Sequence, residues 1–434
     1  MAWIACVSSL PAEDGFELPP IRYSTSPSTD PVSRLIDRNE AGQIQWQRDP
    51  KFGLLPSLLR ELDVPLESQV LVFSKTSLQI HKISPSNPRA LYFNDSVYIG
   101  YVPGSDTLEL AANDVRLGAV FYTLNSQPDE LDAEDTTAPI ATPEFARPRI
   151  VRDRGQCLSC HATTRTENVP GYLVRSIFSD RAGRPRTGSS SYTTDDRSPW
   201  KQRWGGWYVT GTHGSMRHMG NAFAIDRDDP QKIDLESGAN QTSLPARVPS
   251  HLHPMPHSDL VALMVLEHQS RVHNLITRAN YEATQAIAMD EAMNEALQRP
   301  HGHRSESTQR RILASANALY EAITFTGEVP LQSPVRGTSP FADHFAQRGP
   351  RTPDQHSLRD LDLNERLFRW RLSYLIYTPE FQQLPNEILT IVKTRLRQDL
   401  HPDPAAAHPP RWSDEERRVL QEILRETLPG WLDA

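Results

Sequence analysis

The sequence of 434 residues has only three cysteines, Cys6, Cys157 and Cys160. So few cysteines argue against a small disulfide-rich scaffold, in which several bridges replace a hydrophobic core. No run of eighteen apolar residues occurs in the chain, so we expect no transmembrane helix. The net charge of −8 gives no electrostatic attraction to nucleic acid, so we expect no nucleic-acid partner.

The chain also lacks the glycine-rich patterns G-x-x-x-x-G-K and G-x-G-x-x-G, which bind nucleotide phosphates. No pair of acidic residues stands out as a general acid and base. Hydrophobic residues make up 38% and charged residues 23%, as in a soluble globular protein with room for two or three domains. The 36 prolines predict long irregular connections and short helices.

Residues 1–12 form a short apolar run that ends in small residues and is followed by acids. This pattern is typical of the end of a secretory signal peptide whose basic front is missing. It predicts a protein that is exported, in a bacterium to the periplasm. The alternative interpretation is a disordered N-terminus that happens to carry a few hydrophobic residues.

The N-terminal part of the chain divides by its pattern of residue types. Residues 13–65 are rich in Pro, Ser and Asp and predict an extended arm with one short helix at 54–62. Residues 66–145 contain strand-like runs, with a turn expected at 94–95. They predict a small antiparallel β-rich domain, which ends in a charged linker that contains prolines.

The remaining chain changes character twice. Residues 146–257 show little regular periodicity and are dense in Gly, Arg, Trp and His, as loop-built sites are. Apolar residues then recur at three- and four-residue spacing, which predicts an α-helical half at 258–434, with Ser258 capping its first helix. Further helices are predicted at 310–324, 363–377, 386–398 and 413–428. The expected fold is therefore α+β and multi-domain.

The sequence Cys157-Leu158-Ser159-Cys160-His161 places a histidine directly after two cysteines that are separated by two residues. In haem c, two such cysteines form thioether bonds to the vinyl groups, and the adjacent histidine lies beneath the iron as an axial ligand. All three requirements are met by Cys157, Cys160 and His161. The segment therefore predicts one covalent haem c with His161 as the proximal ligand.

Two other uses of a C-x-x-C pair are weaker. A zinc site needs a second pair of ligands, and the five-residue spacing of His213 and His218 is the only zinc-like feature. A thioredoxin-like redox pair belongs in a βαβ unit, whereas the sequence around Cys157 is rich in Arg and Gly and is typical of a loop.

On these residues the chain resembles c-type cytochromes. The match covers the CxxCH motif and the segment after it, in which VPGYL at 169–173 is similar to the loop near the proximal histidine of small cytochromes c. Small cytochromes c have a helix just before the motif, whereas EFARPRIVRDRGQ at 144–156 is expected to be extended. The resemblance implies one haem c and an electron-transfer role.

The chain is also similar to a group of large, exported bacterial proteins that carry a single haem. The stretches behind this similarity are PSNPRALYFNDSVYIGYVPG at 85–104, RWGGWYVTGTHGSMRHMGN at 203–221 and SYLIYTPEF at 373–381. This resemblance covers most of the chain but implies no substrate.

Iron in haem c takes a second axial ligand or keeps an open position. Four candidates lie close together in the sequence: His218 and Met219 are favoured equally, ahead of Met216 and His213. Their separation from the CxxCH motif is similar to that between the His and Met ligands of small cytochromes c. Methionine ligation raises the reduction potential relative to a second histidine. The alternatives are a core methionine and a hydrogen-bonded structural histidine.

Cationic and aromatic residues gather around the motif. A planar guanidinium pairs well with a carboxylate, so some of the nearby arginines are expected to bind the haem propionates and the rest to form a solvated face. These arginines are Arg147, Arg149, Arg152, Arg154, Arg165 and Arg175. The aromatic candidates for the wall of the haem site, or for ordinary core packing, are Trp200, Trp204, Trp207 and Tyr208.

Two functions agree with these residues, and electron transfer is favoured. In the first, the chain is an exported monohaem cytochrome that exchanges electrons with a redox partner protein or with a small-molecule donor or acceptor. In the second, it is a peroxidase-like haem c oxidoreductase with an open distal site, where His213 and Arg217 are the candidate acid–base pair. The single CxxCH motif differs from the two motifs of bacterial dihaem peroxidases.

Overall fold

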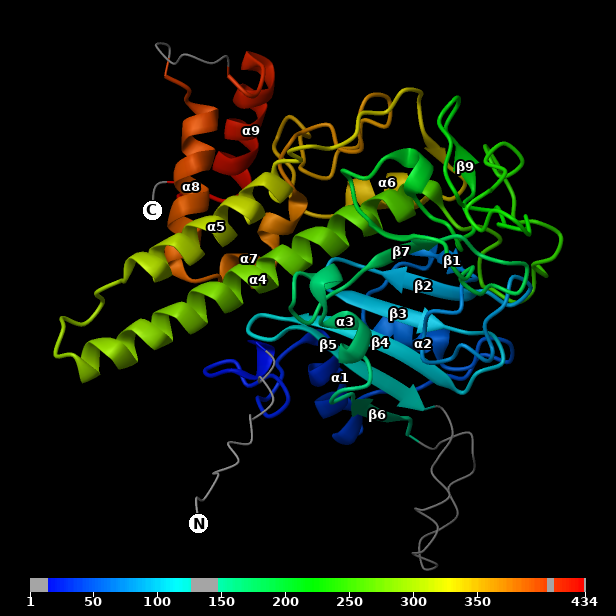
Figure 1. Ribbon diagram of the computed structural model, residues 1–434, viewed down its shortest axis with the longest axis horizontal. Helices are drawn as coiled ribbons and strands as arrows, with labels where there is room; N and C mark the ends of the chain where they lie inside the picture. The colour runs from blue at the N-terminus through cyan, green and yellow to red at the C-terminus, as the bar shows by residue number, and fades with distance from the viewer. Residues whose placement is uncertain (1–14, 126–146, 404–409, 433–434) are drawn as a thin grey trace, which may run out of the picture.

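The computed structural model describes residues 15–125, 147–403 and 410–432 (Figure 1). It is a mixed α+β structure with a six-stranded antiparallel sheet, in which strands that follow one another in the chain are also neighbours. The strands are β1 (Val70–Val72), β2 (Arg89–Phe93), β3 (Val97–Tyr101), β4 (Thr107–Asp114), β5 (Gly118–Asn125) and β6 (Arg149–Arg152).

The helices lie mainly in the C-terminal half of the chain. They are α1 (Pro31–Glu40), α2 (Leu55–Glu61), α3 (Leu158–His161), α4 (Leu260–Ala296), α5 (Glu306–Ile323), α6 (Phe341–Gln347), α7 (Pro379–Gln382), α8 (Asn386–Leu400) and α9 (Asp414–Thr427). Two small sheets pair β7 (Val174–Ile177) with β8 (Ser191–Thr194), and β9 (Gly211–Thr212) with β10 (Arg336–Gly337). Among the described helices, none has the length and apolar character needed to cross a membrane.

The predicted antiparallel strands are confirmed. A hairpin turn joins β2 to β3 where it was expected, because the Asn94 side chain accepts hydrogen bonds from the backbone N–H groups of Ser96 and Val97 at 3.0 and 2.8 Å. The segment 144–156 was expected to be extended, and its described part contains β6 at the edge of the sheet. The division of the chain into separate domains stays a prediction.

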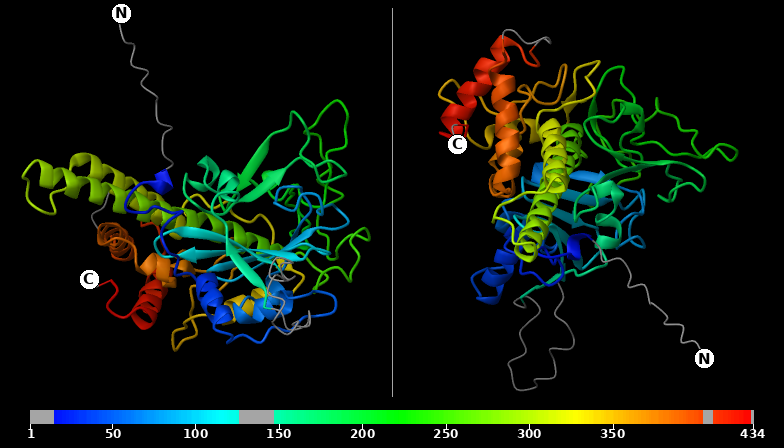
Figure 2. Two further views of the ribbon diagram at one scale, coloured as in Figure 1. Left: turned by 90° about the horizontal axis from the view of Figure 1, so that it is seen from below. Right: turned by 60° about the vertical axis from the view of Figure 1, so that its left-hand side comes forward.

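The two faces of the sheet pack against different parts of the chain, because successive side chains of a strand point to opposite faces. Ile99, on one face, belongs to the hydrophobic core that also contains Leu35 of α1 and Leu58 of α2. Arg89 and Tyr98, on the opposite face, line a cavity beneath α3 and α4. Figures 1 and 2 show α3 on the side of the sheet that faces away from α1 and α2.

Helix α1 corrects the prediction that residues 13–48 form only an extended arm. The Asp30 carboxylate accepts hydrogen bonds from the backbone N–H groups of Val32 and Ser33 at 2.7 and 3.0 Å, which caps the helix. Pro31 occupies the first helical position, where its missing N–H has no cost. A cap and an N-terminal proline therefore start a helix inside a proline-rich stretch. The predicted short helix that follows is confirmed as α2.

The long helix α4 connects the sheet to the helical half. Every residue from Leu260 to Thr277 is buried, because this part of the helix is covered by the sheet, by the loops around β7 and β9 and by the C-terminal helices. The rest of α4 runs past the sheet with α5 alongside it (Figure 1). Three of the predicted helices, at 310–324, 386–398 and 413–428, are confirmed as α5, α8 and α9.

The predicted helix at 363–377 is wrong, and so is the predicted cap at Ser258. The Asp362 carboxylate accepts hydrogen bonds from the three backbone N–H groups of residues 364–366, and this local turn competes with a helix. Asp259 caps α4 instead of Ser258, because the Ser258 hydroxyl donates to the Tyr208 carbonyl at 2.6 Å.

Replacing Asp259 with Ala should strongly destabilise the protein. The buried Asp259 carboxylate accepts from two N–H groups of α4, from two N–H groups that follow β10 and from the Ser339 hydroxyl, so five donors lose their acceptor. We expect the free energy of unfolding to fall by about 2–4 kcal/mol. The control is Ser413→Ala at the exposed cap of α9, which should cost about 1 kcal/mol. Equal losses in urea unfolding of the two variants would contradict the prediction.

Candidate functional site

The residues of the CxxCH motif lie on one helical turn directly after β6. The Cys157 carbonyl accepts hydrogen bonds from the N–H groups of Cys160 and His161 at 3.2 and 2.9 Å, which forms α3. The Asp153 carboxylate accepts from the Cys157 N–H at 2.9 Å and fixes the start of the turn. Leu158 is buried in the core and anchors the turn, whereas Cys160 is exposed. Local structure therefore holds both thiols and the imidazole on one short segment.

His161 is held in the form that binds a metal. Its Nδ1 lies 2.8 Å from the Gly171 carbonyl oxygen, which can only accept, so Nδ1 carries the proton and Nε2 keeps its lone pair. Burial lowers the pKa of the His161 ring, which keeps it neutral. A backbone carbonyl that accepts from one ring nitrogen is the usual partner of a histidine whose other nitrogen binds a metal.

Gly171 reaches His161 because α4 holds the loop in place. The Asn274 side chain accepts from the Tyr172 N–H at 2.8 Å and donates to the Tyr172 carbonyl at 2.7 Å. A Cβ atom at position 171 would lie 2.2 Å from Asn274 Oδ1, so only glycine permits this approach. The carbonyl that orients His161 is therefore positioned by packing between the loop and α4.

A cavity of 430 Å³ lies between the sheet and α4, and Cys157, Cys160 and His161 all line it. Its volume is within the range of roughly 300–1,000 Å³ that is usual for cofactor and ligand sites. Leu266 and Ser270, one turn apart on α4, line the same cavity. A second cavity of 370 Å³ shares Cys160 and His161 with the first, so the two adjoin at the motif.

Two arginines on the wall of these cavities have a buried Nε atom with no hydrogen-bond partner among the described residues, Arg89 and Arg175. A buried donor without an acceptor is costly, so an anion beside either side chain is favourable. Burial lowers the pKa of Arg175, and the charge of nearby Arg165 lowers it further. The carboxylates of haem propionates fit these two guanidinium groups.

The position of Arg89 depends on its neighbours in the sheet. Its Nη2 lies 2.5 Å from Glu109 Oε2, and a Cβ atom at Gly100 would lie 2.7 Å from its Nε. Gly100 on β3 therefore lets the Arg89 side chain lie across the sheet beneath the motif. Arg89 was not among the predicted site residues, because it is far from the motif in sequence. The only sequence signal for Arg89 was that this charged residue lies two positions before the apolar Leu91, and therefore on the same face of the predicted strand.

The redox-pair interpretation disagrees with the surroundings of Cys157. The first cysteine of a catalytic C-x-x-C pair has a lowered pKa, which makes it a thiolate at neutral pH. Burial, and then the charge of Asp153, raise the pKa of Cys157 to about 12. Cys157 is therefore a neutral thiol, as expected of a structural or modified cysteine rather than of a reactive one.

The zinc interpretation lacks its second pair of ligands. Within residues 15–125, 147–403 and 410–432, no group of three or more His, Cys, Asp or Glu side chains is placed to hold a metal ion. His213 and His218, the histidines considered for this purpose, lie against Trp200 and each other instead of the cysteines. The iron of a haem c needs only one of these side chains, the histidine of the CxxCH motif. The lack of a group of three metal-binding side chains among the described residues therefore does not test the haem prediction.

The two predicted histidine candidates for the sixth ligand lie in the core. His218 Nδ1 accepts a hydrogen bond from the Gly220 N–H at 3.0 Å, and His213 Nε2 accepts from the Asn240 N–H at 3.0 Å. Burial lowers the pKa of His218 to about 3 and also lowers that of His213, so both rings are neutral. In each ring the second nitrogen then carries the proton, so neither ring has a free lone pair.

The two methionine candidates also pack elsewhere. The Met219 sulfur accepts from the Ser176 hydroxyl at 3.7 Å, and the Met216 sulfur accepts from the Gln332 N–H at 3.4 Å. The described linings of both cavities contain none of the four candidates. The arrangement gives no support to His218 or Met219 as the axial ligand, and that assignment stays a prediction.

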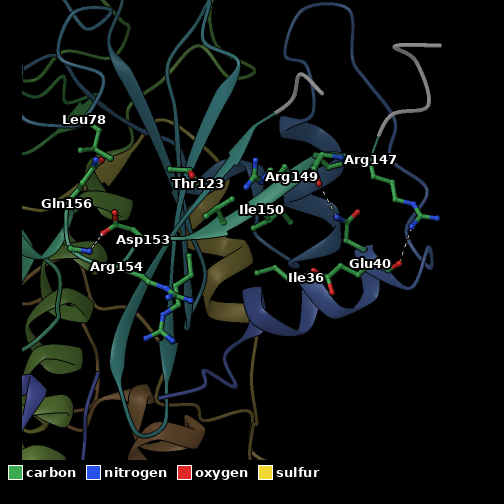
Figure 3. Close-up of a pocket in the computed structure, with 15 residues that line it drawn as sticks. Ile36, Glu40, Leu78, Thr123, Arg147, Arg149, Ile150, Asp153, Arg154 and Gln156 are labelled. Carbon is green, nitrogen blue, oxygen red and sulfur yellow. Dashed lines mark hydrogen bonds between the residues drawn. The ribbon is translucent and has the colours of Figure 1, made fainter. Parts of the chain in front are cut away.

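Most of the predicted arginines and aromatic residues lie outside the cavities. Arg165 and Arg175 line them, whereas Arg152 donates to the backbone carbonyls of Tyr23 and Ser26 at 2.7 Å. A surface groove beside β6, which shares Leu78, Thr123 and Gln156 with the first cavity, is lined by Arg147, Arg149, Arg152 and Arg154 (Figure 3). Of the predicted aromatic residues, Trp207 lines both cavities, while the core holds Trp200, Trp204 and Tyr208.

Comparison with known proteins adds no family to this description. No protein-family model matches the chain, and no curated protein or solved structure matches it either. The resemblance to c-type cytochromes therefore stays a prediction that depends on the motif and its surroundings.

The raised pKa of Cys157 predicts a large difference in reactivity between the two cysteines of the haem-free protein. At pH 8 few Cys157 side chains are thiolates, so iodoacetamide should alkylate Cys157 at least tenfold more slowly than the exposed Cys160. The rate at Cys157 should still rise at pH 10. The measurement uses a Cys6→Ala background with either Cys157→Ala or Cys160→Ala, followed by mass spectrometry. Similar rates at the two cysteines would contradict the prediction.

Proposed function

We propose that the chain is a monohaem c-type cytochrome that acts in electron transfer. Cys157 and Cys160 bind the vinyl groups of the haem, and His161 is the proximal ligand of its iron. The observation that carries this proposal is the hydrogen bond from His161 Nδ1 to the Gly171 carbonyl, on the wall of a cavity that both cysteines also line. A bound haem c supplies a redox centre that accepts and releases one electron at a time.

The protein's own residues orient and enclose this group. Arg89 and Arg175 bind the propionates, since within the described part of the chain the Nε of each is buried on the cavity wall without a hydrogen-bond partner, although Arg89 also pairs with Glu109 through Nη2. The three proposed domains each contribute: the β-rich part at 66–145 provides Arg89, the haem segment at 146–257 provides the motif, and the helical part at 258–434 provides Leu266. These residues would cover the group on the sides of the sheet and of α4, and burial of a haem is one of the factors that set its reduction potential.

A second function, as a haem c oxidoreductase with an open distal site, is favoured by one specific observation. In the described residues, the linings of both cavities contain no methionine and no histidine besides His161. An iron site without a second axial ligand leaves one position for a small molecule such as a peroxide. The predicted acid–base pair is not supported there, because His213 is buried against Trp200 and Arg217 pairs with Glu236 at 2.7 Å.

The covalent attachment is tested by staining the denatured protein for haem after expression in a bacterium with cytochrome c maturation. The wild-type band should stain, and the Cys157→Ala, Cys160→Ala double variant should not. Ser159→Ala is the matched control, since it changes an exposed side chain between the two cysteines but keeps both thiols and should stain fully. A properly exported wild-type protein that does not stain would contradict the proposal. The predicted export sequence at 1–12 lies outside the described residues, and recovery from the periplasm tests it in the same experiment.

The coordination state separates the two functions. An electron carrier with a filled sixth position should be low-spin in both oxidation states and should not bind carbon monoxide. Optical spectra of the purified holoprotein measure both properties, and His218→Ala and Met219→Leu would then identify the sixth ligand. A high-spin ferric protein whose ferrous form binds carbon monoxide would instead favour the oxidoreductase, and this is the outcome that matches the described cavity walls, which offer no second histidine or methionine.

A further inference from the structure

A row of buried polar side chains leads from the 430 Å³ cavity at the motif, called the haem cavity below, to a third and much smaller cavity. Tyr172 lines the haem cavity and donates a hydrogen bond to Asn113 Oδ1 at 2.9 Å. Asn113 Nδ2 lies 2.7 Å from His273 Nδ1, and His273 Nδ1 lies 3.5 Å from Glu380 Oε1. Asn113, His273 and Glu380 line a cavity of about 10 Å³, enough space for about one water molecule.

These four residues come from four separate parts of the chain. Asn113 is in β4, His273 in α4 and Glu380 in α7, while Tyr172 follows the motif. Figure 1 shows α7 beside α4. All four side chains are buried, with 6% or less of each residue exposed. Such a row is costly to assemble in a core unless its polar groups are paired.

The donors and acceptors in the row show which atoms of His273 and Glu380 carry protons. Asn113 Nδ2 can only donate, so His273 Nδ1 accepts and the proton of a neutral ring is on Nε2. Glu380 Oε1 is buried and has no hydrogen-bond partner among the described residues. A buried carboxylate oxygen without a donor is strongly disfavoured, so Glu380 holds a proton at neutral pH.

The surroundings of Glu380 agree with this protonation state. The titratable groups that act on it are Asp95 from the β2–β3 turn, His273 from α4, Tyr98 from β3 and Tyr172 from the haem segment. None of these four is a cation at neutral pH, because burial lowers the pKa of His273 to about 3. Burial, together with the charge of Asp95, raises the pKa of Glu380 to about 8, and it outweighs the hydrogen bonds from the backbone of Glu380 and from the side chains of Asn113 and Thr378, which lower the pKa.

We propose that Glu380 takes up a proton when the haem site is reduced and releases it when the site is oxidised. The inference rests on the proposed function. One electron enters the site from a one-electron donor, one proton enters from water through the small cavity, and an O–H bond forms on Glu380. On oxidation this O–H bond breaks, and the electron and the proton leave. The proton balances the charge of the electron, which is otherwise costly in a buried site.

This exchange follows from electrostatics between buried groups. The oxidised site carries one more positive charge than the reduced site, and a nearby positive charge favours the ionised carboxylate. Because the row is buried, and is hydrogen-bonded from Tyr172 through Asn113 to His273, the charge is weakly screened along it. The proton need not pass through Asn113, since its route to water is the small cavity, where partly exposed Asn280 forms part of the wall.

The test is the midpoint potential of the purified holoprotein between pH 5 and pH 10. In the wild type the potential should fall as the pH rises, by up to about 59 mV per unit for one proton per electron. The slope should centre near the raised pKa of Glu380, about 8. Glu380→Gln keeps the shape of the side chain but cannot exchange a proton, so its potential should stay flat in this range.

Glu328→Gln is the matched control, because burial also raises the pKa of Glu328 to about 7 but this residue lines neither the haem cavity nor the small cavity. It should keep the wild-type slope. A direct second measurement is the infrared difference between reduced and oxidised protein, where a protonated-carboxyl band should appear on reduction and be absent in Glu380→Gln. A wild type with a flat potential, or a Glu380→Gln variant with the wild-type slope, would overturn the proposal. Failure of the proposed function is distinguishable, because the wild type would then carry no stainable haem.

Discussion

The burial of α4 on all sides is the constraint on which the rest of the structure depends. From Leu260 to Thr277 the helix has no exposed residue, yet many of its side chains are polar and need partners inside the protein. Those partners include the sheet and the loop after the motif. Gln269 donates to the Tyr98 hydroxyl of the sheet at 2.8 Å, and the Asn274 side chain bonds to both the N–H and the carbonyl of Tyr172. One buried helix therefore fixes the sheet and the haem segment relative to each other.

This constraint explains how a loop without regular structure orients His161, the proposed proximal ligand. The two hydrogen bonds between the Asn274 side chain and the Tyr172 backbone fix the position of Gly171. The Gly171 carbonyl then accepts a hydrogen bond from His161 Nδ1. On the other side of the imidazole, the Phe121 ring packs with its centroid 4.9 Å from that of His161. The imidazole is held between the sheet and a loop that α4 supports, so its orientation is a property of the whole fold rather than of the motif.

Sequence reasoning found what depends on local pattern and missed what depends on packing. The motif, the hairpin turn after β2 and three C-terminal helices are encoded by neighbouring residues and could be predicted. The helix expected at 363–377 was wrong, because Asp362 forms a local turn that the apolar pattern does not reveal. Arg89 could not be found, because only the folded sheet brings it beneath the motif. His218 has the separation from the motif that the resemblance to small cytochromes c implies for the second ligand, but it is buried and its Nδ1 accepts a hydrogen bond from the Gly220 N–H.

The size of the chain also has a physical reason under the proposed function. A short carrier protein leaves little room for ionisable groups that are remote from its haem and still buried. Here the sheet and the helical half enclose the cavity with two cationic side chains, Arg89 and Arg175, and bury a neutral carboxyl, Glu380, beyond the Tyr172 wall. In such a low-dielectric interior, fixed charges act strongly on one another. Under the proposed function, the large fold thereby gives the site an electrostatic environment in which the gain of an electron would favour the gain of a proton.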